Sequence, residues 1–146
     1  AYGYAGTSHK NCQGVSKGII NACLLADRDR TDDGREYVFS AEDLTTVGPI
    51  ELLQDLAVVA TIGADHVERN GHHYFYSLRA FSQSVRDSVL ADHSDLYRRH
   101  DDGVPTVAID DGTIGLDTVV NAPFGAAVRP DLSELPRLDD WLDRDG

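Results

Sequence analysis

The sequence predicts an α/β fold built on parallel strands, and three observations support this prediction. Short apolar runs alternate with helix-like segments from the N-terminus to about residue 73. The segments between successive runs are long enough for right-handed crossovers, which join parallel strands. Polar and charged residues gather where each run ends, and parallel α/β enzymes place their chemistry at the carboxyl ends of their strands.

The first step of this alternation is a strand followed by a helix. The small and aromatic segment Tyr2–Ser8 predicts a strand whose end carries the polar run Thr7–Lys10. Apolar residues then recur at helical spacing, and Asn11 is suited to cap the helix. Gly14 and Gly18 each cost about 1 kcal/mol relative to alanine in a helix. We therefore expect a close backbone approach near the start of this helix.

The second strand is predicted at Tyr37–Phe39 and ends in the polar run Ser40–Asp43. A helix follows from about Pro49 to Ile62, with Pro49 in its first turn and Gly63 as its stop. Its apolar residues cover about two-thirds of the helix surface. We therefore expect neighbours on most sides of this helix.

The third strand is predicted around Asp65–Glu68 and ends in the polar run Arg69–His73. A sheet of three strands would leave both edges bare. We therefore expect the strands to belong to a larger barrel or open sheet. On this interpretation the chain, which begins at Ala1, is a fragment or a processed product.

The C-terminal half of the chain has a different pattern. A short helix is predicted from Ser82 or Ser84, and the segment SDLYRRH continues or follows it. The segments Val104–Asp110 and Thr113–Val120 flank an Asp-Gly turn, which predicts a β-hairpin. A proline-containing loop and an acidic tail complete the chain.

Charge and composition exclude several classes of function. The formal net charge of -12 would repel the phosphates of nucleic acid. No apolar run approaches the roughly 18 residues of a membrane span, and no signal peptide is visible. Cys12 and Cys23 have neither a zinc spacing nor a disulfide framework, so we expect free thiols in a reducing compartment. The sequence thus predicts a soluble, cytoplasmic protein with no nucleic-acid or membrane partner.

The first two strand ends carry candidate functional groups, each with a simpler explanation beside it. The first end offers His9 and Lys10. A desolvated lysine can serve as a proton-transfer base, whereas a lysine beside a turn is usually just solvated. The second end offers Glu42 and Asp43, as metal ligands, partners of a cationic base or substrate contacts. Asp43 can instead cap the next helix.

The third strand end carries more candidate groups: Glu68, Arg69, Asn70, His72 and His73. A glutamate at the end of a buried strand is costly unless paired, so we expect Glu68 to meet a cation, a metal or a ligand. Adjacent histidines on an extended strand point to opposite faces, and no metal-binding spacing supports zinc. The histidines that we interpret as surface residues are His66, His93 and His100.

Three segments of the chain, in order, resemble one known enzyme family. HKNCQGVSKGIINA is similar to a strand-to-helix passage with a lysine and a glycine, FSAEDLTTVGPIELLQDLA to the next strand and helix, and PTVAIDDGTIGLDTVVNAPFG to a closing segment. The family is the enolase superfamily, in its mandelate racemase and muconate-lactonizing enzyme branch. The resemblance covers most of residues 1 to 128 and implies a partial TIM-type (β/α) barrel.

On this resemblance, residues 1–80 form the last three strand–helix steps of the barrel. Residues 81–146 then form a C-terminal helix, a β-hairpin and an acidic tail of the same domain. The chain departs from the family pattern in having no glycine pair after Lys10 and no histidine on the strand that corresponds to the family's seventh. A His-Asp dyad of the racemase type is therefore not expected. We expect the full-length protein to be a homo-oligomer.

The resemblance also implies a chemistry, the abstraction of the proton α to a carboxylate. The product is an enediolate that Mg²⁺ stabilises, on the way to racemisation or epimerisation, cycloisomerisation or dehydration, with sugar acids among the candidate substrates. Lys10 matches the base on the family's sixth strand, and Glu68 matches an acidic group on its eighth. The residues that we assign to substrate binding are His9, Glu42, Asp43, Asn70 and His72. The Mg²⁺ ligands are expected upstream, so none is assigned within this chain.

Two other functions remain open on the sequence. One is a zinc-dependent TIM-barrel hydrolase that uses histidines as ligands. The other is a non-catalytic interaction domain whose acidic surface keeps it in solution. Zinc content would distinguish the first from a Mg²⁺-dependent enzyme, and α-proton exchange would count against the second.

Overall fold

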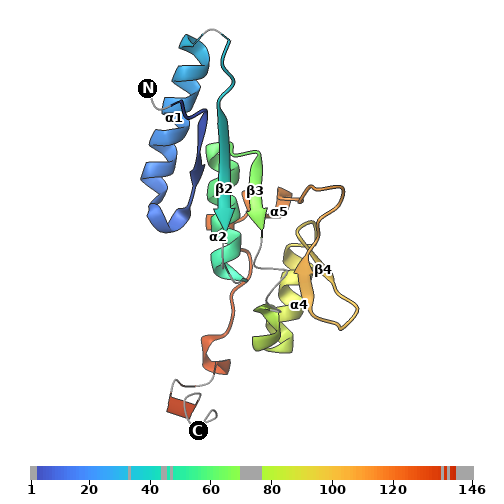
Figure 1. Ribbon diagram of the computed structural model, residues 1–146. Helices are drawn as coiled ribbons and strands as arrows, with labels where there is room; N and C mark the ends of the chain where they lie inside the picture. Colours follow the sequence, from blue (N-terminus) through green and yellow to red (C-terminus); the bar gives the residue numbers. More distant parts are fainter. Residues whose placement is uncertain are drawn as a thin grey trace.

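The structure is a computed structural model that describes residues 3–32, 34–43, 46, 48–69, 77–135, 137 and 139–140. The fold is mixed α/β, with a three-stranded sheet in the N-terminal half and a two-stranded sheet in the C-terminal half. Figure 1 shows helices α1 and α2 running along the larger sheet, and α4 and β4 beyond the carboxyl ends of its strands. Among the described helices, none is long and apolar enough to cross a bilayer.

The three-stranded sheet is parallel, as the sequence predicts. It consists of β1 (Gly6–His9), β2 (Val38–Asp43) and β3 (His66–Arg69), in that order across the sheet. Both strand pairs are parallel, so the carboxyl ends of all three strands lie at one edge of the sheet. In this register Glu42 lies opposite Glu68.

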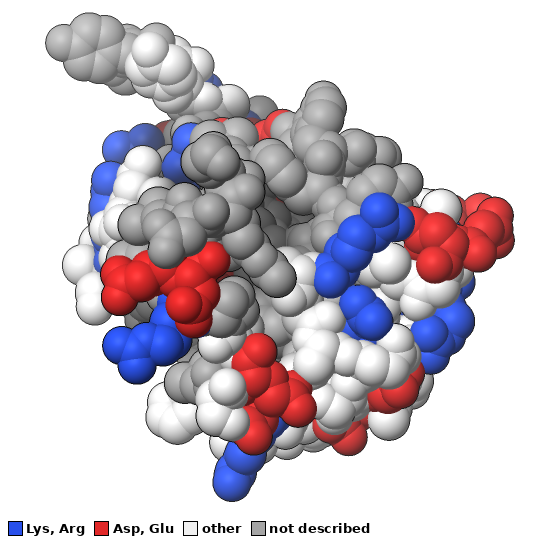
Figure 2. All heavy atoms as spheres, turned by 90° about the horizontal axis from the view of Figure 1, so that it is seen from below, with Lys and Arg blue, Asp and Glu red and all other residues white. Residues whose placement is uncertain are grey.

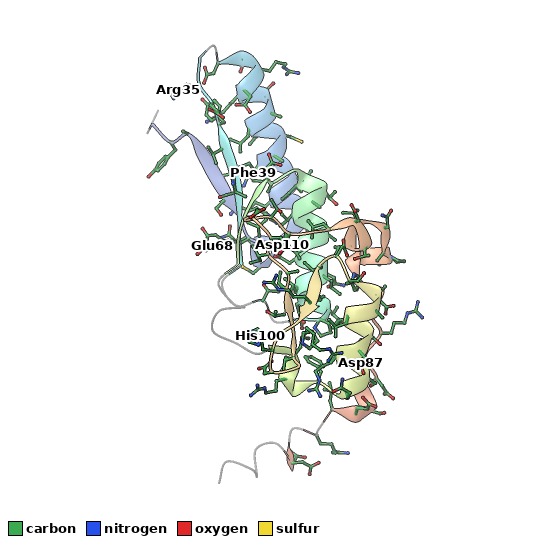
Figure 3. All side chains as sticks on the ribbon, turned by 90° about the vertical axis from the view of Figure 1, so that its right-hand side faces the viewer. Arg35, Phe39, Glu68, Asp87, His100 and Asp110 are labelled. Atoms are coloured by element: carbon green, nitrogen blue, oxygen red, sulfur yellow. The ribbon has the colours of Figure 1, made fainter. Side chains whose placement is uncertain are left out.

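The two faces of this sheet differ in what covers them. Ala41, Phe39 and Val67 pack with Val59 of the second helix in an apolar cluster. Side chains alternate along a strand, so the residues on either side of these in each strand point to the other face of the sheet, which we call the open face. Figure 3 shows Phe39 on the helix side of the sheet and Glu68 on the side away from α2. The residues of the open face are Ser8, Ser40, Glu42, His66 and Glu68.

Helix α1 (Val15–Thr31) begins at Gly14. The prediction that Asn11 caps it is wrong, because Asn11 lies in a separate 3₁₀ turn, Asn11–Gln13, and Gly14 takes the N-cap position with a φ of 99°. The expected close approach is confirmed at Gly18, where an added Cβ would lie 2.4 Å from the His9 ring. Most of the helix is otherwise exposed.

Helix α2 (Ile50–Ile62) is surrounded on most sides, as its composition predicts. Leu52, Leu53 and Leu56 belong to a large apolar cluster shared with the C-terminal half, whereas Val59 packs against the sheet. Gly63 ends the helix in the left-handed conformation, with a φ of 71°, and its N–H reaches the last-turn carbonyls. Helix α2 thus connects the two parts of the protein.

The C-terminal half contains α4 (Gln83–Asp92), β4 (Tyr97–Arg99), β5 (Pro105–Val107) and α5 (Asp117–Asn121). Four 3₁₀ turns complete the described elements: η1, given above, η2 (Ser77–Ala80), η3 (Pro123–Gly125) and η4 (Leu132–Glu134). The predicted helix near Ser82 is confirmed. The Ser82 hydroxyl accepts a hydrogen bond from the Val85 N–H and caps α4.

One prediction for this half is wrong and one is narrowed. The segment SDLYRRH follows α4 and does not continue it, since Tyr97–Arg99 forms β4 and pairs antiparallel with β5. The expected hairpin partner, Thr113–Val120, keeps a single bridge across the Asp-Gly turn, Asp110 to Thr113, and then enters α5. The Asp95 carboxylate explains this outcome, because it accepts hydrogen bonds from both the N–H and the hydroxyl of Thr118.

His93 is fully buried, which contradicts its interpretation as a surface residue. Its Nε2 accepts a hydrogen bond from the Ala127 N–H at 3.1 Å. The Thr118 hydroxyl donates a hydrogen bond to Asp95, so its oxygen accepts a hydrogen bond from His93 Nδ1, also at 3.1 Å. The ring therefore holds one proton, on Nδ1. Burial lowers the pKa of His93, and the charges of Asp92 and Asp95 oppose this shift only in part.

We expect Gly18→Ala to destabilise the protein by about 1–3 kcal/mol, because the added methyl group has no room beside the His9 ring. In an ordinary helix the same change would stabilise. Urea unfolding of the single variants and of the His9→Ala/Gly18→Ala double variant measures the coupling. If the double variant loses as much unfolding free energy as the two single variants lose together, the ring is not the obstacle.

We expect the stability to fall as the pH drops below 6.5, the ordinary pKa of histidine. His93 binds a proton in the unfolded chain in this range but not in the folded state, so protonation stabilises the unfolded state. The slope of unfolding free energy between pH 5 and 7 should decrease in a His93→Gln variant. The exposed His66, changed to Gln, is the control, and an equal decrease there would contradict the assignment.

Candidate functional site

Three candidate residues lie side by side at the carboxyl ends of the strands. Glu42 of β2 and Glu68 of β3 are register partners. Lys10 follows directly after His9, whose partner in β2 is Ala41, and it therefore lies level with Glu42. We call these three residues the strand-end row. Each comes from a different strand, and the parallel register brings them together on the open face.

Lys10 and Glu42 form an ion pair, with 2.6 Å between Nζ and Oε2. Both side chains are about 30% exposed, so solvent reaches the pair. The hydrogen bond and charge of Glu42 raise the pKa of Lys10 above its ordinary value, and the same hydrogen bond lowers the pKa of Glu42. A base needs the opposite shift, so this geometry holds Lys10 as a protonated ammonium group.

Glu68 is exposed, which corrects the expectation that it ends a buried strand. Strand β3 lies at one edge of the described sheet, and this position leaves the residue open to solvent. Its charge adds a smaller contribution that raises the pKa of Lys10. Glu68 thus belongs to the same electrostatic group as the ion pair.

A hollow of about 350 Å³ lies on the open face beside the strand-end row. The Asp-Gly turn of the C-terminal half reaches this hollow through Gly112. Figure 3 shows Glu68 and Asp110 of the same turn at one level of the molecule. Sequence reasoning missed this contribution, because it assigned the turn to a separate hairpin. The residues that line the hollow are Ser40, Ala41, Glu42, Asp65, His66, Val67, Glu68 and Gly112.

The other residues assigned to substrate binding are not placed in this hollow. His9 is only 4% exposed, and its Nε2 lies 2.6 Å from the Asn11 side-chain oxygen, under α1. The structure describes only the backbone of Asp43, at the end of β2. Asn70 and His72 lie outside the described residues.

The part of the chain that the structure describes contains no set of ligands for magnesium or zinc. No group of three or more His, Cys, Asp or Glu side chains converges there on a common point. Glu42 is already engaged with Lys10. Cys12 and Cys23 are both exposed free thiols, as the sequence predicts.

Several acidic residues of the C-terminal half are partly neutralised by local pairs. Figure 2 views the molecule from below, and blue basic and red acidic side chains lie next to one another in several places on this face. Two ion pairs tie β4 to its surroundings, from Arg98 to Asp110 and from Arg99 to Asp87. Arg79 pairs with Asp102 at 2.9 Å. The net charge of -12 is therefore not spread evenly over this side of the protein.

We expect Glu42→Gln to lower the pKa of Lys10, because the substitution removes the charge and weakens the hydrogen bond that raise it. The chain has two lysines, Lys10 and Lys17, so NMR of ¹³C-labelled lysine side chains gives two signals to follow between pH 8 and 12. Lys17 is exposed, bonds only to Gln13 among its described contacts and serves as the internal control. An unchanged Lys10 titration would show that the ion pair does not persist in solution.

Comparisons with protein-family models, with curated proteins and with solved structures find no match for this chain. The family resemblance drawn from the three sequence segments therefore remains a proposal. The assignment of a function rests on the residues at the strand ends and on their geometry.

Proposed function

We propose that the chain forms the last three strand–helix steps of a (β/α) barrel enzyme of the enolase superfamily that transfers a proton at the carbon next to a carboxylate. The observation that carries this proposal is the strand-end row. Lys10, Glu42 and Glu68 come from three consecutive parallel strands and lie at one edge of the sheet. Barrel enzymes place their reacting groups at this edge.

The distribution of polar and apolar residues over the sheet supports the barrel. The face toward α2 is apolar, and the open face is polar toward the carboxyl ends. In a barrel, helices cover the outer face, and the inner face leads to the active site at the carboxyl ends of the strands. The parallel order β1-β2-β3 is the order in which consecutive strands of a barrel follow one another.

The ion pair with Glu42 supports a resting state in which Lys10 carries its proton. A protonated Lys10 donates its proton to the carbanionic carbon of an enediolate, a C–H bond forms, and a neutral amine remains. In the reverse direction the neutral amine takes the α-proton and the substrate becomes the enediolate. Since Glu42 raises the pKa of Lys10, Lys10 rests in its ammonium form, and abstraction of the α-proton requires that it first lose this proton.

The hollow favours a substrate that carries hydroxyl groups. Glu42 and Glu68 accept hydrogen bonds, and Ser40 and His66 can both donate and accept them. These side chains suit the hydroxyl groups of a hydroxy acid or sugar acid, whose carboxylate the two glutamates would repel. The described residues do not fit a Mg²⁺ site, so a metal would need ligands from upstream in the full-length protein.

We expect the full-length protein to exchange the α-proton of a hydroxy acid with solvent deuterium, and Lys10→Ala to slow this exchange about 100-fold or more. Substrate binding should change little. Lys17→Ala is the matched control, because Lys17 lies outside the strand-end row. Proton NMR in D₂O with a panel of hydroxy acids measures the rates.

The two possible failures of this experiment have different meanings. Absence of exchange with every acid in the panel would contradict the proposed function. Exchange that survives in the Lys10→Ala variant would contradict only the role of Lys10. Three acidic residues at successive strand ends upstream of this chain would support the family assignment, and their absence would contradict it.

A further inference from the structure

An apolar groove lies between α1 and α2, on the side of the sheet away from the strand-end row. Its volume is about 740 Å³, and its lining runs along α2 from the first turn to the last. The α2 residues that line it are Glu51, Gln54, Asp55, Ala57, Val58, Thr61 and Ile62. This spacing follows one face of the helix over about 17 Å, given 1.5 Å of rise per residue. The groove is thus long enough for an elongated ligand.

The groove exposes apolar side chains that water would ordinarily drive inward. Val15 and Ile19 of α1 are 43% and 48% exposed, and Phe124 is 87% exposed. All three line the groove. Phe124 also has a φ of 53°, in the left-handed region that a bulky residue rarely adopts. A patch of this composition is typical of a surface that another element covers.

The charge of the groove defines the chemistry of that element. Glu51 is an exposed acid in the first turn of α2, whereas Val58 and Ile62 lie in the second half of the helix. Asp55 also lines the groove, but it is buried and already has an interaction partner. Among the described residues that line the groove, none is a lysine or an arginine. One end of the groove is therefore acidic and the other apolar. A second copy of this chain, with its net charge of -12, is poorly matched to the acidic end.

We propose that this groove binds an amphipathic helix of a partner protein, with an apolar face and a lysine or arginine at one end. The apolar face packs on Ile19, Val58 and Phe124 in the manner of a helix in a groove. The cationic end meets Glu51, and this contact fixes the direction of the bound helix. The proposal does not depend on the catalytic function, because α1 and α2 lie on the opposite side of the sheet from the open face.

The two cysteines provide a direct test of this site. Cys12 lines the groove, whereas Cys23 is an exposed residue of α1 that does not line it. The probe is a synthetic amphipathic helix of about 14 leucine and lysine residues, added at physiological salt to Cys23→Ser or Cys12→Ser protein. At ten times its Kd, the peptide should slow alkylation of Cys12 about tenfold and leave that of Cys23 unchanged.

Two neighbouring isoleucines of α1 supply matched variants. Ile19 lines the groove, and Ile20, at 59% exposed, does not. Ile19→Ser should weaken peptide binding about tenfold, whereas Ile20→Ser should leave it unchanged. Because both side chains are exposed, neither change should affect folding, which circular dichroism checks. A leucine and glutamate peptide of the same pattern should bind at least tenfold more weakly than the lysine peptide.

Several results would overturn the proposal. Equal protection of both cysteines would mean that the peptide binds the acidic surface without a site. Equal effects of Ile19→Ser and Ile20→Ser, or equal binding of the two peptides, would also contradict it. Self-association that protects Cys12 in the absence of peptide would show that a second copy covers the groove.

Discussion

The burial of α2 on opposite sides is the constraint on which the rest of the structure depends. Leu53 and Leu56 are completely buried in the cluster shared with the C-terminal half, and Val59 closes the cluster against the sheet. A single helix therefore carries the packing of both parts. Gly125 confirms how closely the C-terminal half approaches it, because an added Cβ there would lie 2.5 Å from the Leu53 carbonyl oxygen. The position of the Asp-Gly turn over the sheet follows from this attachment.

The strand-end row and the groove lie on opposite sides of the same sheet, and they differ in physical character. The row is polar and its geometry is set by strand register, so its charges are fixed relative to one another. The groove is apolar and is set by the packing of two helices. A protein with both surfaces can carry out chemistry at one and bind a partner at the other.

Local signals predicted much of the fold, and distant contacts produced the errors. Gly63 and Ser82 mark helix ends through their own backbone and side-chain chemistry, and both predictions are confirmed. The predicted hairpin was wrong because β5 pairs with β4, which precedes it in the chain. Asp95 accepts a hydrogen bond from the Thr118 N–H in the first turn of α5. The burial of His93 depends on Thr118 and Ala127, which lie 25 and 34 residues away. The chain order of Lys10, Glu42 and Glu68 suggested a shared edge of the sheet. The ion pair between Lys10 and Glu42, however, depends on the register of the strands.

The contact between His9 and Gly18 has a consequence for how this protein can vary. The ring occupies the space that any larger residue at position 18 would need. The two positions are nine residues apart on different elements, yet Gly18 cannot be enlarged while His9 stays the same. Homologous chains that replace the glycine should therefore also have replaced the histidine by a smaller residue. Paired substitution is the route that avoids this clash, and the pair would serve as a marker of this strand–helix junction in distant relatives.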